Sequence, residues 1–293
     1  MEQPITIIVT GANGQLGRSI RELAIDNIHL RFAFFNSEDF PIESVRRGEL
    51  LFEIYQPQFC INCAAYTAVD KAEKETGRAF LVNGDAPGTL ASICDFYGTR
   101  LIQVSTDYVF NGQASSPYKE SDPVDPINAY GTSKLMGEQL VLKKNARNVV
   151  VRTSWLYAPF GRNFVKTMLR FMKDKPEINV VADQLGSPTY APDLALVLVD
   201  MVKQYIKNPE LPGGIYHYSN DGIISWFDFA NAIRELTGSN CKVNPIPTSA
   251  YPTPAKRPAY SVLDNSKIVR DFGITLRPWK DSLERCLKTL RAI

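Results

Sequence analysis

Near its beginning the chain reads Ile5-Thr6-Ile7-Ile8-Val9-Thr10-Gly11-Ala12-Asn13-Gly14-Gln15-Leu16-Gly17. The run Ile5–Thr10 is apolar and β-branched, which predicts a short buried strand. The glycines that follow are spaced G-x-x-G-x-x-G, unlike the commoner G-x-G-x-x-G. Glycine permits a tight turn and lets the backbone approach a pyrophosphate closely, and a helix that begins there directs its free N–H groups at phosphates. The stretch therefore predicts a dinucleotide-binding turn; an ordinary strand–turn–helix is the alternative.

The rest of the first half alternates apolar runs with longer helical segments. Further strands are expected at Leu30–Phe35, Phe59–Cys63, Leu101–Ser105 and Val149–Thr153. Helices are expected from the glycine turn to about Ala24 and at Ser44–Tyr55, Pro87–Phe96 and Ala129–Leu142. Continuous apolar strands separated by helices form a parallel sheet that is covered on both faces. With right-handed crossovers, this pattern predicts a Rossmann-like, doubly wound α/β fold.

The second half is less regular and predicts a smaller C-terminal lobe. Phe164–Met172, Asp193–Tyr205 and Ser225–Leu236 are candidate amphipathic helices, the last with Ser225 as its N-cap and Gly238 near its end. Prolines are concentrated in Pro245–Pro258, which predicts an extended, ordered loop. We expect residues 1–160 to form an NAD(P)-binding domain and residues 161–293 to form mainly a substrate-binding lobe. A part near residues 191–218 could return to the Rossmann sheet.

The composition argues against several classes of protein. Of the 293 residues, 44% are hydrophobic and 22% are charged, and the net charge is only +2. Because no block of Lys or Arg stands out, we expect no binding to nucleic acid or to a membrane surface. The N-terminus lacks the pattern of a signal peptide, and no window approaches the roughly 18 apolar residues of a transmembrane helix. Five cysteines at irregular spacing indicate reduced thiols and a cytoplasmic protein.

Cys60-x-x-Cys63 could be a redox or metal-binding pair. It lies within a predicted buried strand, where residues three apart face opposite ways. No second pair and no nearby His completes a metal site. We therefore interpret both cysteines as core residues, predict no metal site, and assign no role to His29 or His217.

Two later segments contain the candidate catalytic residues. Ligands of doubly wound sheets bind outside the carboxyl ends of the strands, so Thr106, at the end of the fourth strand, should face a substrate. Tyr130 and Lys134 are four residues apart and share one face of a helix. An ammonium nearby, and an oxidised nicotinamide, should lower the pKa of the tyrosine from about 10 towards neutrality. Tyr130 could then donate a proton to a carbonyl oxygen that Thr106 also binds, while Lys134 holds the cofactor ribose.

The end of the second strand bears on the choice between NADH and NADPH. The segment Phe34–Asp39 has no acidic residue directly at the strand end, where an acid would bind the ribose hydroxyls. Arg18 lies just beyond the glycine turn. These features favour NADPH or dual use, but Arg18 is equally well explained as a solvated helix residue.

These motifs together resemble the extended short-chain dehydrogenases/reductases and, within them, the family of dTDP-4-dehydrorhamnose reductases. The resemblance covers nearly the whole chain. Its blocks are Gly11–Gly17, Asn62–Glu73, Ser105–Phe110, Tyr130–Lys134, Arg152–Tyr157, Asn163–Met168, Asp183–Thr189 and Pro247–Pro258. The resemblance implies that NADPH or NADH reduces the 4-keto group of dTDP-4-dehydro-L-rhamnose to give dTDP-L-rhamnose. A homodimer is an open alternative to a monomer.

The resemblance also implies roles for individual residues. The catalytic residues would be Thr106, Tyr130 and Lys134. The cofactor would contact Gly11, Asn13, Gly14, Gln15, Leu16, Gly17, Ala64, Ala65, Tyr66, Tyr130 and Lys134. The substrate would contact Val69, Thr106, Asp107, Tyr130, Trp155, Asn163 and Arg257. Arg257 would bind the pyrophosphate, a task that suits the planar, bidentate guanidinium.

Some points of the sequence leave alternatives open. Pro41 stands where the family often has an Asp near the adenine, so the adenosine contacts in Phe34–Ile42 are undetermined. Dehydratases of the superfamily usually have Asp-Glu after the Thr, whereas Thr106 is followed by Asp107 and Tyr108. An epimerase would use the same Tyr and Lys but recycle its cofactor. A non-catalytic regulatory subunit of methionine adenosyltransferase type also resembles these reductases, although the intact Thr, Tyr and Lys favour an enzyme.

Overall fold

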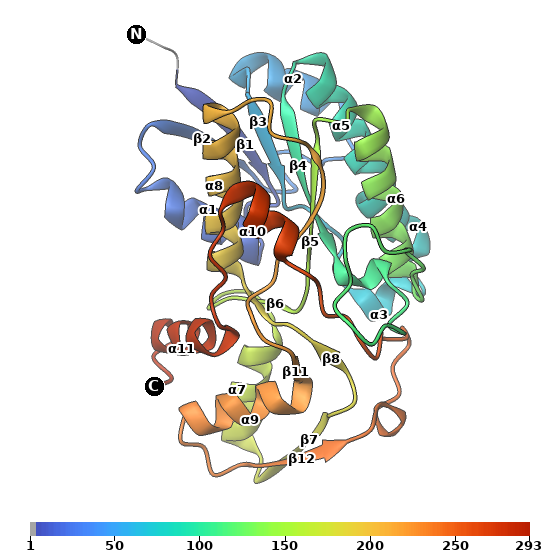
Figure 1. Ribbon diagram of the computed structural model, residues 1–293, viewed down its shortest axis with the longest axis vertical. Coiled ribbons are helices and arrows are strands. Elements are labelled where there is room, and N and C mark those ends of the chain that lie inside the picture. Colours follow the sequence, from blue (N-terminus) through green and yellow to red (C-terminus); the bar gives the residue numbers. More distant parts are fainter. Residues whose placement is uncertain (1–3) are drawn as a thin grey trace.

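The computed structural model describes residues 4–293 and is built around a six-stranded parallel sheet (Figure 1). The strand order is β10-β5-β4-β3-β1-β2, and every neighbouring pair is parallel. The strands are β1 (Ile5–Thr10), β2 (Leu30–Phe35), β3 (Phe59–Asn62), β4 (Arg100–Thr106), β5 (Val149–Thr153) and β10 (Gly214–His217). The predicted doubly wound α/β fold is confirmed.

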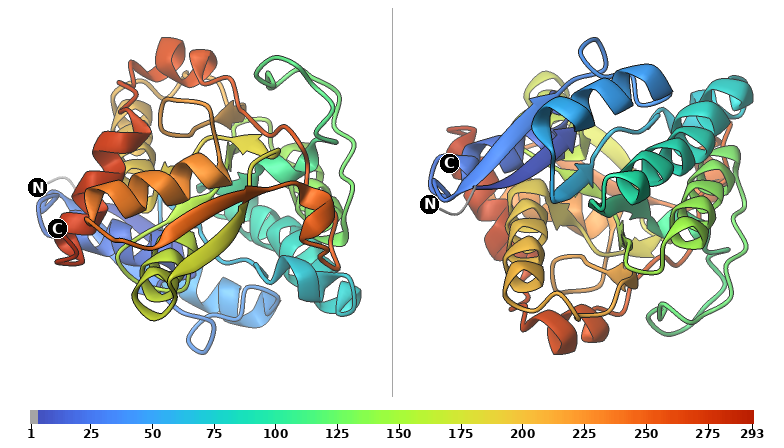
Figure 2. Two further views of the ribbon diagram at one scale, coloured as in Figure 1. Left: turned by 90° about the horizontal axis from the view of Figure 1, so that it is seen from below. Right: turned by 90° about the horizontal axis from the view of Figure 1, so that it is seen from above.

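Helices cover both faces of this sheet, as the continuous apolar strands require (Figure 2). Ile7 and Val9 pack with one set of helices, while Ile8, on the opposite face of β1, packs with the other. The first set is α1 (Gln15–Ala24), α8 (Ala191–Lys207) and α10 (Ser266–Phe272). The second set is α2 (Val45–Tyr55), α5 (Ala86–Phe96) and α6 (Ala129–Lys144). Between β3 and α5 the chain forms α3 (Val69–Ala72), α4 (Thr76–Phe80) and a π-helical turn, Leu81–Asp85.

A second hydrophobic core lies beyond the carboxyl ends of the strands, in the lower part of Figure 1. It contains Val165, Phe229 and Leu283, one from each of three helices. The helices are α7 (Phe164–Asp174), α9 (Trp226–Leu236) and α11 (Trp279–Thr289). Three two-stranded sheets accompany them: β6 (Leu156–Tyr157) with β9 (Thr189–Tyr190), β7 (Glu177–Val181) with β12 (Lys242–Ile246), and β8 (Leu185–Gly186) with β11 (Ile224–Ser225).

Helix α8 and strand β10 belong to the core and the edge of the large sheet. Residues 191–218 therefore return to the sheet, as the sequence allowed. The division into domains at residue 160 stays a prediction.

Two sequence-based expectations need correction. The proline-rich segment Pro245–Pro258 is not extended loop throughout, because its first residues belong to β12 and Thr248–Ala250 forms a short 3-10 helix. Pro245 is compatible with a strand here because β12 lies in a sheet of only two strands, where one edge makes no ladder bonds. Strand β3 ends at Asn62, so Cys63 lies beyond the strand in which we expected it.

Side-chain caps fix the beginnings of three helices near the site. Asn128 caps α6 and Asn163 caps α7, and Ser225 forms a capping box with Asp228 at α9, as its predicted N-cap role requires. Within residues 4–293, every helix falls short of the length and apolar character needed to cross a bilayer. Met1–Gln3, part of the segment in which we expect no signal peptide, lie outside the described residues.

Candidate active site

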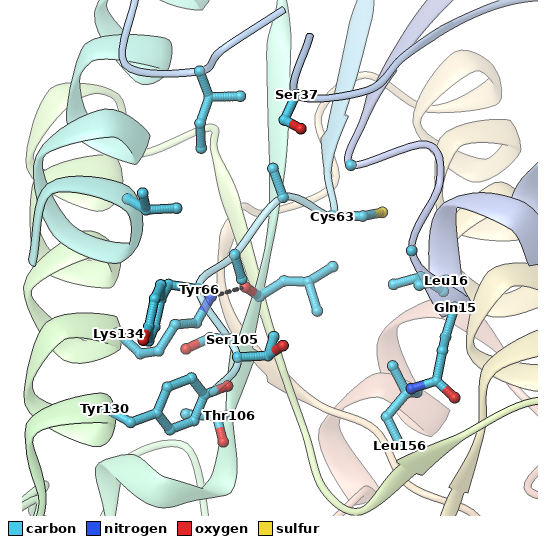
Figure 3. A pocket seen from close by; sticks show the side chains of 18 of the residues that line it. Gln15, Leu16, Ser37, Cys63, Tyr66, Ser105, Thr106, Tyr130, Lys134 and Leu156 are labelled. Atoms are coloured by element: carbon cyan, nitrogen blue, oxygen red, sulfur yellow. Dashed lines mark hydrogen bonds between the residues drawn. The ribbon is translucent and has the colours of Figure 1, made fainter. Parts of the chain in front are cut away.

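A cavity of about 840 Å³ opens at the carboxyl ends of the parallel strands. The segments that follow β1, β2, β3, β4 and β5 all contribute to its wall. Figure 3 shows Tyr130, Thr106 and Lys134 together on one side, with Gln15 and Leu16 on the other. The position agrees with the rule for ligand sites of doubly wound sheets.

The glycine turn fits closely against the rest of the sheet. Gly11 has φ +64°, and a Cβ there would lie 2.6 Å from the backbone nitrogen of Ala64. A Cβ on Gly17 would lie 2.5 Å from the carbonyl oxygen of Gly11. Larger residues would thus separate the helix from the strand and close the cradle. Of the predicted cofactor residues in the turn, five line the cavity, namely Gly11, Asn13, Gly14, Gln15 and Leu16, while Gly17 packs beneath them.

The loop after β2 forms a further part of the wall that the sequence left undetermined. Asn36 accepts hydrogen bonds from the backbone N–H groups of Glu38 and Asp39, which folds the loop back on itself. Arg78 reaches the cavity from α4 and pairs with Glu43 at 2.9 Å. The lining residues of this loop are Asn36, Ser37, Phe40, Pro41, Ile42 and Glu43.

Arg18, which we considered as a phosphate ligand, is not among the lining residues. Its guanidinium lies 4.2 Å from the ring centroid of Phe160, at an exposed position on α1. This placement favours the interpretation of Arg18 as a surface helix residue over a role in choosing NADPH.

A buried chain of amides holds the loop after β3. Asn62 accepts from the backbone N–H of Ala64 and donates to Gln103. Asn83 accepts from the backbone N–H of Tyr66 at 2.8 Å and donates to Ser133 of α6. The predicted cofactor residues Ala64, Ala65 and Tyr66 consequently line the cavity.

Cys63 is adjacent to this loop and also lines the cavity. It packs against the core on one face of the sheet, as expected, but it lies one residue beyond the end of β3 and not within the strand. Cys60 is fully buried in the core, as expected. Burial raises the pKa of the Cys63 thiol well above its usual range, so the thiol stays protonated and weakly nucleophilic.

Tyr130, Lys134 and Thr106 meet at the end of β4. Lys134 is buried and its Nζ donates to the carbonyl oxygen of Val104 at 2.7 Å. The Thr106 hydroxyl donates to Asp107 at 3.0 Å. Helix α6 approaches the end of β4 closely because residue 131 is glycine: a Cβ there would lie only 2.1 Å from the carbonyl oxygen of Tyr108.

The charges of this group differ from the sequence-based expectation. Burial raises the pKa of Tyr130 to about 12, and a hydrogen bond with Thr106 opposes the shift. The expected lowering by Lys134 was wrong for the protein alone, because the ammonium is directed at the Val104 carbonyl. Burial lowers the pKa of Lys134 to about 8, while the charge of Glu138 opposes that shift. Tyr130 is therefore a protonated phenol at neutral pH.

Asp107 is a buried carboxyl group beside Thr106. Its Oδ2 atom has no hydrogen-bond partner among residues 4–293. Burial raises its pKa to about 7, and the hydrogen bond from Thr106 opposes this. Asp107 lines the cavity, as predicted.

A buried ion pair that the sequence reasoning missed lies next to the end of β4. Arg152 pairs with Glu138 at 2.7 Å, and both side chains are 2% exposed. Ser105 also donates to Glu138, which lies four residues after Lys134 on α6. His217, to which we assigned no role, contacts Arg152, and burial lowers the pKa of this imidazole to about 3. The signal in the sequence was the spacing of Glu138 from Lys134 on one helix face.

Of the four predicted substrate residues outside the group at the end of β4, two line the cavity and two do not. Val69 and Trp155 are on its wall. Asn163 instead caps α7 and donates to Gln15 at 2.8 Å, which links the second core to the glycine turn. Arg257 makes a bidentate ion pair with Asp70, at 2.9 and 3.1 Å.

A parallel sheet with a glycine turn after β1, and a cavity shared by that turn and a Tyr-x-x-x-Lys pair, define a Rossmann-fold oxidoreductase. The family model described as "RmlD substrate binding domain" matches residues 5–292, and the chain belongs to this family.

Individual relatives agree with the family. A protein of Aggregatibacter actinomycetemcomitans named dTDP-4-dehydrorhamnose reductase is 40% identical, and the match covers 98% of each chain. The crystal structure of a dTDP-4-dehydrorhamnose reductase from Clostridium acetobutylicum has a TM-score of 0.93 and 41% identity, covering 98% of this chain and all of that one. The enzyme of the same name from Bacillus anthracis, in complex with NADP, has a TM-score of 0.91 and 38% identity, with 98% and 100% coverage.

Proposed function

We propose that this protein is an NADPH-dependent reductase of the 4-keto group of dTDP-4-dehydro-L-rhamnose, with dTDP-L-rhamnose as its product. The observation that carries the proposal is the single cavity that the glycine turn shares with Tyr130, Lys134 and Thr106. The relatives that are about 40% identical over nearly the whole chain are named for this reaction.

The cradle at the glycine turn suits a dinucleotide. Gly11, Gly14 and Gly17 keep the backbone free of side chains where the chain turns into α1, whose first residues, Gln15 and Leu16, line the cavity. A bound nicotinamide supplies the hydride that attacks the sugar carbonyl carbon. The residues of this chain orient the ring and the ketone and supply the proton that balances the reduction.

We assign the proton to Tyr130. The phenol is protonated at neutral pH because burial raises its pKa to about 12, so it can donate to the carbonyl oxygen as that oxygen becomes an alkoxide. The Thr106 hydroxyl would donate a second hydrogen bond to the same oxygen. Lys134, protonated below about pH 8, would hold the cofactor ribose. The positive ring of the oxidised nicotinamide would stabilise the phenolate that remains on Tyr130.

On the substrate side, we assign the sugar to the wall that contains Val69 and Trp155. Arg257 would bind the pyrophosphate, with Asp70 holding the guanidinium in place beforehand.

The preference for NADPH is supported by the loop after β2, where Asn36 and Ser37 stand in place of an acid that would repel a 2′-phosphate. Arg78, on the same part of the wall, is paired with Glu43, which also lines the cavity.

The test is a spectrophotometric assay with dTDP-4-dehydro-L-rhamnose and each reduced cofactor. We expect stoichiometric oxidation of NADPH. At equal, low concentrations of cofactor, NADPH should be oxidised faster than NADH. Conversion of a sugar nucleotide without net NADPH oxidation would instead indicate an epimerase. No turnover, together with co-purification of a methionine adenosyltransferase, would indicate a regulatory subunit.

We further propose that the enzyme acts in the cytoplasm, where five unpaired cysteines remain reduced. The possible homodimer stays a prediction, to be tested by sedimentation of the purified protein. Residues 4–293 contain no cluster of three or more His, Cys, Asp or Glu side chains placed to hold a metal ion.

A further inference from the structure

Trp155 has an unusual backbone conformation at the wall of the cavity. Its φ is +47°, in the left-handed region that bulky residues rarely adopt. The other two non-glycine residues with positive φ among residues 4–293, Gln56 and Arg291, follow the last turns of α2 and α11, where this conformation is common. Trp155 lies between β5 and β6 and ends no helix. Such strain persists only where surrounding groups enforce it, and it is concentrated at ligand sites.

Two neighbours enforce the position of the Trp155 indole. The ring of Trp226 stacks on it, with 3.6 Å between the ring centroids and 11° between the planes. Gly186 lies at the indole edge, where a Cβ would come within 2.6 Å of Cε2 and 2.8 Å of Nε1. The ring of Phe164 in turn packs against the ring of Trp226, with 4.7 Å between the ring centroids.

The two neighbours are themselves held together by the chain. Strands β8 and β11 pair so that Gly186 is opposite Ile224, and Trp226 follows two residues later. Trp226 is the first residue of α9, whose start is fixed by the capping box of Ser225 and Asp228. Trp226 is not among the residues that line the cavity, whereas Trp155 is.

We infer that Trp226 is a positioning residue for sugar binding: its stacked ring holds Trp155 in the left-handed conformation and so fixes the aromatic wall that meets the sugar. The inference rests on the proposed function, which supplies the sugar nucleotide. An aromatic surface suits the apolar C–H groups of a deoxysugar. The cofactor turn is formed by other residues, so Trp226 should affect the sugar nucleotide and leave the cofactor unaffected.

The first test separates the two substrates. Trp226→Leu should raise KM for the sugar nucleotide by about five- to tenfold, the size expected for the loss of one aromatic pair. KM for NADPH should stay within about twofold, because no cofactor contact changes. Trp226→Phe, which keeps a ring that can stack, should restore most of the affinity for the sugar nucleotide.

A double-mutant cycle tests whether Trp226 acts through Trp155. In a Trp155→Leu background, adding Trp226→Leu should change KM for the sugar nucleotide no further, because the indole that Trp226 positions is already absent. Additive effects would overturn the inference. Gly186→Ala provides a variant that leaves both tryptophans in place but displaces the Trp155 indole, and it should also raise this KM alone.

Trp279→Leu is the matched control. Trp279 packs against Phe229 in the same core but does not line the cavity, so this variant should lower the melting temperature without changing either KM. An unchanged KM for the sugar nucleotide in folded Trp226→Leu would overturn this inference, and so would an equal rise in KM for NADPH. Neither result would contradict the proposed function. Wild-type protein that does not oxidise NADPH with the sugar nucleotide would overturn the proposed function itself.

Discussion

Among the individual side chains, Tyr130 is the one whose proton the proposed reaction consumes. We expect Tyr130→Phe to lower kcat by about 10²–10⁴-fold, the usual contribution of general acid catalysis. The dissociation constant of NADP⁺ should barely change, because the phenyl ring keeps its edge-to-face contact with Tyr108. Steady-state kinetics and a cofactor titration measure the two effects. Tyr108→Phe is the matched control and should retain kcat; a Tyr130→Phe enzyme with more than about a tenth of wild-type kcat would require another acid.

The buried carboxyl group of Asp107 should make the free energy of unfolding depend on pH. Its pKa is raised by burial from 3.8 to about 7 in the folded protein, so folding is favoured while the carboxyl is neutral. This contribution is fully present below pH 3.8 and is lost as the pH rises through about 7. Relative to Asp107→Asn, the wild type should therefore lose at most about 4 kcal/mol of unfolding free energy between about pH 4 and pH 8. Urea unfolding at several pH values measures this, and a difference that does not vary with pH would contradict it.

The predicted site residues that line the cavity lie at or just after the end of a strand of the large sheet, or on α6. Thr106 was placed by its position at a strand end and Tyr130 and Lys134 by their spacing on a helix; all three line the cavity, and their catalytic roles stay a prediction. The contacts of Asn163 and Arg257 were not predictable, because their partners Gln15 and Asp70 are more than a hundred residues away in the sequence. In the protein alone the pKa of Tyr130 rises because of burial, which spacing along a helix does not reveal, and the predicted lowering by the oxidised nicotinamide stays a prediction.

Among the secondary-structure elements, the turn between β1 and α1 requires small residues. Gly11 and Gly98 both have positive φ, but only Gly11 has backbone atoms where a Cβ would be. Gly98→Ala should cost about 1 kcal/mol of stability and leave cofactor binding unchanged. Gly11→Ala should be more destabilising and raise the dissociation constant of NADP⁺ at least tenfold. Thermal unfolding and cofactor titration compare the two, and equal effects would show that the close contact of Gly11 with Ala64 is unimportant.

The long elements were predictable and the short ones were not, for a physical reason. The strands of the large sheet are mostly apolar runs, and α7, α8 and α9 have apolar residues at helical spacing, so local sequence suffices for them. Strands such as β6 and β8 contain two residues each and exist only because a distant partner pairs with them. The π-helical turn Leu81–Asp85 likewise has no local signature.

For the molecule as a whole, the pair Asp70–Arg257 connects α3 of the sheet domain to the proline-rich segment of the second half. We expect Arg257→Ala to raise KM for the sugar nucleotide by about 10- to 100-fold with a smaller effect on kcat, because a charge-assisted hydrogen bond to the pyrophosphate is lost. Arg270→Ala is the control, since Arg270 is exposed and pairs with its neighbour Asp271. An unchanged KM in the folded Arg257→Ala protein would remove this residue from the site.

The central claim is that this protein transfers a hydride from the cofactor to C4 of the sugar while Tyr130 supplies the proton. Incubation of the enzyme with dTDP-4-dehydro-L-rhamnose and NADPH that carries deuterium at C4 of the nicotinamide, on its transferable face, tests this directly by NMR of the product. We predict one NADPH oxidised per product molecule, with deuterium at C4 of the sugar. Tyr130→Phe should transfer deuterium about 10²–10⁴-fold more slowly than the wild type. Product formed without deuterium at C4, or without oxidation of NADPH, would contradict the claim.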